Sequence, residues 1–219
     1  MILAVNNTEA ITNDELQALG LIESRGLLPV YGERLSFFIA GPPGCGKSVT
    51  TAQILSLFPN QIKYLFTDIK EKDRAFAGID FRRVRMTKDI LSKLTLDDLT
   101  KDGDCWCVFD DIDKIRDPAL NKILIALMDN IIANGRSHGG HTINIIVTSH
   151  SLSDYKKTKY SIENCDYWII FPNKTIKSQL VTLLKKIGLE KSDLSLYNRI
   201  IIHRSTPLFM ITDFFITLI

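Results

Sequence analysis

Residues 41–48 follow the pattern glycine, four residues, then glycine, lysine and serine, which is typical of a loop that binds phosphates. Glycines adopt backbone angles that a Cβ would penalise, so several N–H groups can point at one anion. The lysine would contact the β- and γ-phosphates, and the serine hydroxyl would bind Mg²⁺. We therefore predict a site for ATP and Mg²⁺ whose residues are Gly41, Pro42, Pro43, Gly44, Cys45, Gly46, Lys47, Ser48 and Val49.

Two adjacent acids, Asp110 and Asp111, follow an apolar run at 105–109. A buried parallel strand reads as a continuous apolar run, and ligands collect at its carboxyl end. A run that stops on two acids is typical of a Walker B strand. We predict that Asp110 binds Mg²⁺ together with Ser48, and that Asp111 polarises the attacking water. Asp113 is interpreted as surface charge or as charge at a helix start.

Two further residues could act on the γ-phosphate or the attacking water. His150 ends the polar stretch that follows the apolar run 142–147, beside the predicted Walker B strand. Arg136 lies in a glycine-rich loop, where a mobile arginine could stabilise transition-state charge. The alternatives are an ordinary structural role for His150 and a surface position for Arg136. His138 and His141 are interpreted as ordinary loop histidines.

Apolar runs that alternate with helical patterns predict the fold that would position these residues. Strands are expected at 35–40, 61–67, 81–85, 105–109, 142–147 and 166–171, and helices at 48–57, 87–94, 117–134, 153–164 and 175–187. This alternation gives an α/β fold, a mostly parallel sheet with helices on both faces, as in P-loop NTPases. Small strands at 199–204 and 208–212 are expected to pair near the C-terminus, and polar stretches at 95–99 and 101–104 are interpreted as turns.

The composition suits one globular domain of 219 residues, with 45% hydrophobic residues and a net charge of +2. We expect an N-terminal extension at 1–33 and a P-loop ATPase domain at 34–219. The longest apolar runs are too short to span a membrane, and the first residues do not form a signal peptide, so we expect no transmembrane segment and no secretion. The four cysteines are scattered, which indicates reduced thiols at Cys45, Cys105, Cys107 and Cys165.

These features follow one another in a characteristic order: the phosphate loop, a strand ending in two aspartates, a helix leading to the loop with Arg136, a strand ending at His150, and the stretches 167–172 and 207–212. In this order the chain resembles the genome-packaging ATPases of large eukaryotic DNA viruses. These form the poxvirus-type branch of the FtsK/HerA superfamily of P-loop ATPases. The resemblance covers roughly residues 34–219. It implies a RecA/FtsK-like fold and a homo-oligomeric ring.

The resemblance also implies ATP hydrolysis coupled to the translocation of double-stranded DNA into a preformed capsid, with capsid or portal-like proteins as partners. The place of action would be a virus-infected host cell, in the cytoplasm, a viral factory or the virion. By the same resemblance Arg136 is an arginine finger at a subunit interface, and His150 takes a place where many relatives carry glutamine.

Contact with DNA is expected to be with phosphates and independent of sequence, because a pump must pass any sequence. The candidate residues are Arg82, Arg83, Arg85, Lys156, Lys157 and Lys159, for which a solvated face is the alternative. Other functions stay open: a helicase or a DNA-transfer or segregation motor, a small nucleoside or nucleotide kinase, and a nucleotide-locked assembly protein.

Overall fold

The computed structural model describes residues 34–68, 73–152, 164–171, 179, 209–212 and 216–218. The predicted N-terminal extension and the predicted strand at 199–204 lie outside these residues. The predicted helices at 153–164 and 175–187 also lie outside them, except for residues 164 and 179. Lys156, Lys157 and Lys159 are therefore not placed.

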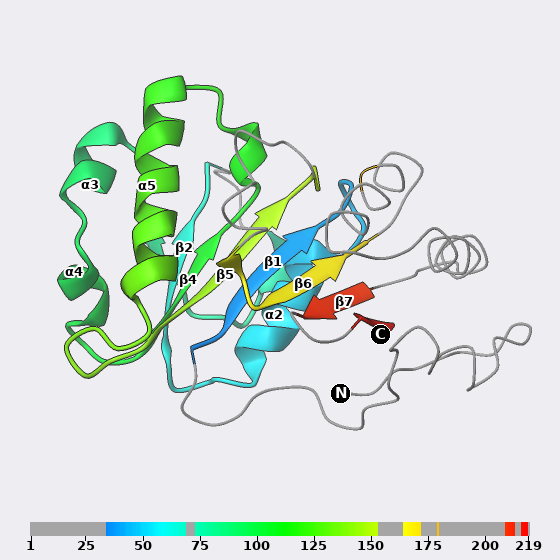
Figure 1. Ribbon diagram of the computed structural model, residues 1–219, viewed down its shortest axis with the longest axis horizontal. Coiled ribbons are helices and arrows are strands. Elements are labelled where there is room, and N and C mark those ends of the chain that lie inside the picture. The colour runs from blue at the N-terminus through cyan, green and yellow to red at the C-terminus, as the bar shows by residue number, and fades with distance from the viewer. Residues whose placement is uncertain are drawn as a thin grey trace, which may run out of the picture.

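Eight strands form one sheet in the order β3-β2-β4-β5-β1-β6-β7-β8 (Figure 1). The first six in this order are parallel, as predicted, and are β3 (Arg82–Val84), β2 (Ile62–Phe66), β4 (Cys105–Phe109), β5 (Ile143–Ser149), β1 (Ser36–Ala40) and β6 (Tyr167–Ile170). β7 (Phe209–Thr212) is antiparallel to β6 and to β8 (Ile216–Leu218). The described C-terminal pair is thus β7 with β8, a strand that the sequence pattern did not predict.

The order of the central strands brings the predicted site residues to one edge. β5 pairs with β1 on one side and with β4 on the other. The phosphate loop follows β1, the two aspartates follow β4 and His150 follows β5. Because the strands are parallel, these three segments all leave the sheet at its carboxyl edge.

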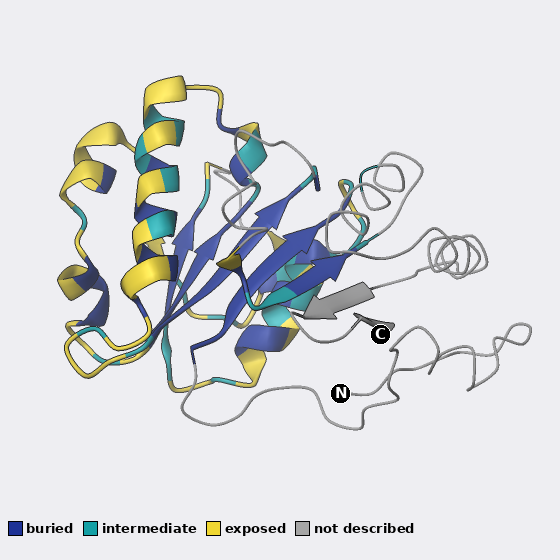
Figure 2. Ribbon diagram, in the orientation of Figure 1, coloured by how far each residue is buried: buried dark blue, intermediate teal, exposed yellow. Residues whose placement is uncertain are grey.

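Helices cover both faces of the sheet, as predicted (Figure 1). One face carries α3 (Lys88–Lys93), α4 (Leu96–Thr100) and α5 (Pro118–Asn134), and the other carries α2 (Lys47–Ser56). Alternate side chains of β1 join two separate apolar clusters: Phe38 packs in the cluster with Leu124 of α5, and Phe37 in the cluster with Leu55 of α2. Burial of each such side chain contributes about 1.5–3 kcal/mol to the stability of the fold. The central strands are buried on both faces, so both clusters stabilise them (Figure 2).

The interpretation of 95–99 as a turn was wrong, because these residues begin α4. Thr95 Oγ1 accepts the N–H of Asp98 at 3.2 Å, and the Asp98 carboxylate accepts the N–H of Thr95 at 2.9 Å. This capping box satisfies two amide groups that a helix start leaves unpaired. Leu96 and Leu99 are buried in the apolar cluster beside the sheet, and this burial stabilises a helix that is too short to be stable by itself. The stretch 101–104 is turn, as predicted.

Two short 3₁₀ helices complete the described elements, η1 (Arg74–Phe76) and η2 (Ile112–Lys114). α5 begins with Asp117, whose carboxylate accepts the N–H groups of Ala119 and Leu120, and with Pro118 in its first turn. Within the described ranges, no helix combines the length and the apolar character that crossing a membrane requires.

Candidate active site

The predicted phosphate loop runs from the end of β1 into the first turn of α2. The N–H of Gly41 donates to the carbonyl of Ser149 at 3.0 Å, which fixes the start of the loop to the end of β5. A Cβ at Gly41 would lie 2.6 Å from Cβ of Phe171, so this close approach excludes a side chain. Gly46 has φ 110°, in the region that favours glycine. The loop therefore has the backbone shape that the motif predicted.

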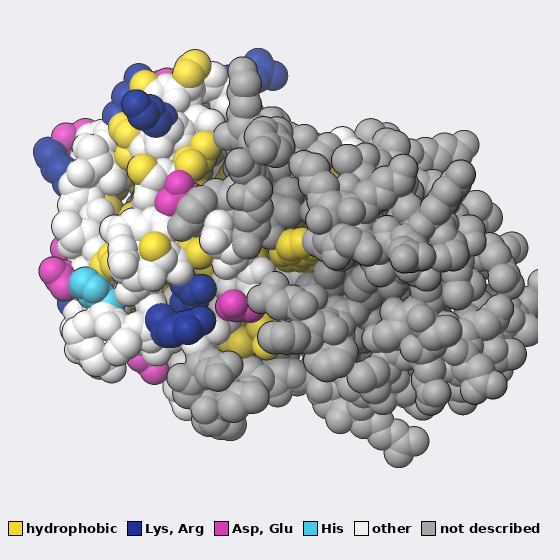
Figure 3. All heavy atoms as spheres, viewed as in Figure 1, with side chains coloured by type: hydrophobic (Ala, Val, Ile, Leu, Met, Phe, Trp, Pro, Cys, Tyr) yellow, Lys and Arg dark blue, Asp and Glu magenta, His cyan; other side chains and the backbone are white. Residues whose placement is uncertain are grey.

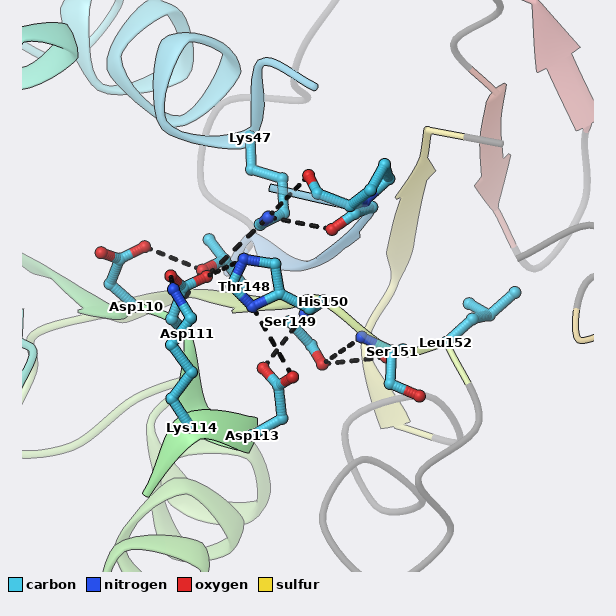
Figure 4. A network of polar contacts seen from close by, with 12 residues as sticks. Lys47, Asp110, Asp111, Asp113, Lys114, Thr148, Ser149, His150, Ser151 and Leu152 are labelled. Atoms are coloured by element: carbon cyan, nitrogen blue, oxygen red, sulfur yellow. Dashed lines mark hydrogen bonds and ion pairs between the residues drawn. The ribbon is translucent and has the colours of Figure 1, made fainter. Parts of the chain in front are cut away.

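Lys47 lies between the loop and the acidic residues (Figure 4). Its Nζ donates to the carbonyls of Gly41 at 2.9 Å and Pro42 at 3.3 Å, and lies 3.8 Å from Oδ1 of Asp111. The side chain is buried. A buried ammonium at the mouth of a phosphate loop can contact anionic oxygens with little competition from water.

Thr148 holds both aspartates of the predicted Walker B strand. Its hydroxyl donates to Oδ1 of Asp110 at 2.8 Å and accepts the N–H of Asp111 at 2.8 Å. Asp111 has φ 52° and ψ 47°, and it is the one non-glycine residue with positive φ in the described part of the chain. Such a conformation persists where surrounding contacts impose it, and it is frequent at functional sites. The single hydroxyl of Thr148 thus fixes the carboxylate of Asp110 and the backbone of Asp111.

Asp110 has the character of a cation ligand. It is 7% exposed, and burial raises its pKa to about 6, with the negative charge of Asp111 acting in the same direction and the hydrogen bond from Thr148 opposing it. A buried carboxylate with a raised pKa gains from a nearby cation. Carboxylate and hydroxyl oxygens are the ligands that Mg²⁺ prefers, so Asp110 and Ser48 form a suitable donor set.

Both carboxylate oxygens of Asp111 lie near a cation, but only Oδ2 makes a hydrogen bond. Oδ2 lies 2.7 Å from Nζ of Lys114. Oδ1 is buried, makes no hydrogen bond, and lies 3.5 Å from Nε2 of His150 as well as 3.8 Å from Nζ of Lys47. The carboxylate can therefore accept a proton or a hydrogen bond at Oδ1. Sequence reasoning did not single out Lys114, for which no pattern in the sequence gave a signal.

Of the two interpretations of Asp113, surface charge was wrong, whereas charge at a helix start is confirmed, because Asp113 lies in the first turn of η2. Its side chain is 14% exposed, and Oδ1 accepts the backbone N–H of His150 at 3.0 Å. η2 turns the chain back at this point, so that Asp113 faces the end of β5 rather than solvent (Figure 4). The acid–histidine cluster, which we define as Asp110, Asp111, Asp113 and His150, is therefore larger than the predicted pair of aspartates.

Arg136 is not close to the active site of its own chain. It is exposed in the turn after α5, where the N–H of Ile143 donates to the carbonyl of Gly135 at 2.8 Å. The phosphate loop meets the other end of β5, at Ser149. At ~3.3 Å per residue the strand between these points spans about 20 Å. His138 and His141 lie in the same loop, near Asp97 and Asp104 respectively.

Comparison with protein families gives a match over 36–162 to the model of the AAA domain, dynein-related subfamily. The chain is also 29% identical over 200 residues to "Uncharacterized protein V3" of Sputnik virophage. The aligned region covers 83% of this chain and 75% of the virophage protein.

Two solved structures share the fold. B204, the DNA-packaging ATPase from Sulfolobus turreted icosahedral virus, matches with a TM-score of 0.54 and 12% identity over 84% of this chain and 96% of B204. The genome packaging NTPase B204 from Sulfolobus turreted icosahedral virus 2, in complex with ATP-gammaS, matches with a TM-score of 0.51 and 12% identity over the same shares of the two chains.

Proposed function

The chain belongs to the AAA domain family, in its dynein-related subfamily, and from this premise we propose that it is a motor that translocates double-stranded DNA into a viral capsid. The chain is a P-loop ATPase. The observation that most supports the packaging role is the shared fold with B204, because the likeness extends over 96% of that DNA-packaging ATPase and 84% of this chain. We propose that the protein belongs to the poxvirus-type branch of the FtsK/HerA superfamily. We also propose that it acts in virus-infected cells.

The residues of the site divide the work of hydrolysis. Lys47, whose Nζ lies between the phosphate loop and Asp111, contacts the β- and γ-phosphates in this proposal. Ser48 and Asp110 bind Mg²⁺, which neutralises phosphate charge when it is bound. Asp111 accepts the proton of the attacking water at Oδ1, the oxygen that Lys114 leaves free. His150 acts as the sensor beside it.

The position of Arg136 supports a ring in which each active site is shared between two subunits. An exposed arginine about 20 Å from its own phosphate loop cannot reach that nucleotide, but it can serve the nucleotide of a neighbouring subunit. This is the arrangement that an arginine finger in trans requires. Capsid or portal-like proteins would be the further partners of such a ring.

For contact with DNA we propose the basic residues of the edge strand β3. Arg82 and Arg83 of β3 are exposed, and so is Arg85, which follows the strand. Arg82 also pairs with Asp102, and its guanidinium lies over the ring of Tyr64. On the face shown in Figure 3, the basic and acidic side chains of the described residues are interspersed. Contact with DNA phosphates would therefore depend on a few residues that the ring brings together, and would weaken with salt.

The test is the steady-state rate of ATP hydrolysis per subunit, with and without long double-stranded DNA, at several protein concentrations. A DNA motor with shared sites is expected to show a rate that rises with both. Arg136→Ala should keep ATP affinity but lose this rise, and Lys122→Ala, which removes an exposed cation from α5, should keep it. A rate that ignores DNA and concentration but increases with a nucleoside or nucleoside monophosphate would overturn the proposal in favour of a kinase.

A further inference from the structure

Asp113 makes two contacts with His150 through its two carboxylate oxygens. Oδ1 accepts the backbone N–H of His150 at 3.0 Å, and Oδ2 lies 3.7 Å from Nδ1 of the imidazole ring. On the opposite side of the ring, Nε2 lies 3.5 Å from Oδ1 of Asp111. The ring is thus held between two carboxylates from the same short segment of chain (Figure 4).

The surroundings of His150 favour a neutral imidazole. Burial lowers its pKa, and the positive charges of Lys47 and Lys114 act in the same direction, while the charges of Asp111 and Asp113 oppose them. A neutral imidazole carries its proton on one nitrogen and accepts a hydrogen bond at the other. Which nitrogen is protonated depends on the hydrogen bond that a neighbour offers.

A carboxylate lies beside each ring nitrogen, and each would favour a proton on the nitrogen that it faces, because a carboxylate can only accept. The negative charge of Asp111 Oδ1 is partly offset by the ammonium of Lys47 at 3.8 Å, whereas Asp113 is fixed on His150 by the backbone N–H. We therefore assign the proton to Nδ1, on the side of Asp113. Nε2 is then an acceptor, and it lies next to Oδ1 of Asp111, which is a second acceptor without a hydrogen bond. Two neighbouring acceptors suit a water molecule, which has two O–H donors. The distance of 3.7 Å at Oδ2 is longer than a hydrogen bond, but contacts of this kind commonly tighten when substrate binds.

We propose that Asp113 is a positioning residue for hydrolysis, which orients the His150 ring so that Nε2 and the Asp111 carboxylate together receive the attacking water. This inference rests on the proposed roles of Asp111 and His150, and not on the DNA substrate. In this role Asp113 acts through the His150 ring, and the ring and Asp111 contact the water. The role is absent from the motif because η2 and the end of β5 come together only in the folded chain.

A double-mutant cycle with Asp113→Asn and His150→Gln tests the proposal, with ATP hydrolysis measured without DNA. An asparagine oxygen can still accept the backbone N–H of His150, so Asp113→Asn mainly changes the contact with the ring. In Asp113→Asn we expect kcat to fall about tenfold, with KM for ATP within about twofold of that of the unaltered protein. In a protein that already carries His150→Gln, we expect Asp113→Asn to have little further effect on kcat. The control is Asp97→Asn, which alters another aspartate–histidine pair, with His138 at 2.7 Å, and should leave kcat unchanged.

Three results would overturn the inference: an unchanged kcat in Asp113→Asn, an equal loss in the His150→Gln background, or a rise in KM without a fall in kcat. An equal loss in both backgrounds is also what a merely destabilised fold would give, so the cycle separates positioning from stability. If the protein hydrolysed ATP at a rate that DNA does not change, the proposed motor function would be wrong. The double-mutant cycle could still be measured and would still test the role of Asp113.

Discussion

The phosphate loop and the acid–histidine cluster meet at the same edge of the sheet, but they are built in different ways. Lys47 bonds to carbonyls of its own loop, a few residues away in sequence. The acids of the cluster follow β4, and they contact Thr148 in β5 and His150 at its end, which are far away in sequence. The loop is therefore a local structure, whereas the cluster depends on the pairing of two strands.

This difference separates two tasks. A loop of backbone amides and one ammonium can bind phosphates as soon as the chain turns from strand to helix. The cluster has to place an acceptor oxygen beside the phosphates, and for that it imposes a left-handed backbone on Asp111 and buries the charge of Asp110. We expect substitutions in the loop to reduce binding, and substitutions in the cluster to reduce turnover.

The largest separation is expected from Asp111→Asn. Asparagine has the same shape but cannot accept the proton of the attacking water, so kcat should fall by about 10²–10⁴-fold. Affinity for ATP should stay within about threefold, because the loop is unchanged. Rates from a coupled ATPase assay and affinities from calorimetry check both quantities.

The control for that variant is Asp89→Asn, which removes an aspartate that contacts Lys93 on the surface of α3. It should behave as the unaltered protein, since an exposed ion pair contributes little. Normal turnover in Asp111→Asn would contradict the assignment of Asp111 as the catalytic carboxylate. Of the two regions compared, only the phosphate loop would then have a function in hydrolysis.

Lys47→Ala addresses the other region. The variant loses charge-assisted contacts to the phosphates, each worth about 1.5–3 kcal/mol, so ATP affinity should fall about 100-fold and hydrolysis with it. Lys63→Ala is a matched control, because Lys63 is also a buried lysine that donates to backbone carbonyls, those of Phe58 at 2.8 Å and Gln61 at 2.7 Å.

Lys63 lies at the beginning of β2, at the edge of the sheet away from the phosphate loop. Its substitution should lower the free energy of unfolding but leave ATP affinity unchanged. If both variants lost stability while both retained ATP affinity, Lys47 would have a structural role and the division between the two regions would fail.

The same division explains how much the sequence revealed. The six parallel strands and α2, α3 and α5 were predicted, because continuous apolar runs and helical periodicity are local patterns. α4 was missed because its capping box has aspartate rather than the commoner glutamate or glutamine at the third helical position. β8 was also not predicted, since pairing between short strands is decided by the rest of the sheet.

Within the site, a sequence motif marks every residue of the proposed phosphate loop, and no motif marks the whole cluster. Asp110 and Asp111 were singled out because they follow an apolar run, and His150 because it ends the polar stretch after another. The contacts of Asp113 and Thr148 depend on the register in which Phe109 lies beside Val147, and no local pattern encodes that register. Contacts between strands are a tertiary property, so a sequence pattern gives the members of such a cluster and not their arrangement.

The smallest expected effect concerns stability, and it has the opposite sign to most substitutions at buried sites. Asp110→Asn should unfold at a higher temperature than the unaltered protein at pH 7.5 in buffer without metal or nucleotide. Burial and the charge of Asp111 raise the pKa of Asp110 from 3.8 to about 6, so the ionised form is disfavoured in the folded protein. Asparagine removes that penalty, which corresponds to about 1–3 kcal/mol at neutral pH.

The pH dependence gives the sign of this effect a direct check. Because the folded protein binds a proton at Asp110 more tightly than the unfolded chain does, the unaltered protein loses stability as the pH rises from about 4 to about 6. The advantage of Asp110→Asn should therefore be complete above pH 6 and should shrink below it, in thermal unfolding measured across this range. Hydrolysis by the variant should be lost at every pH, since an amide is a poor ligand for Mg²⁺. An Asp110→Asn protein that is less stable at pH 7.5 would show that the cluster, like the loop, is built without an energetic penalty.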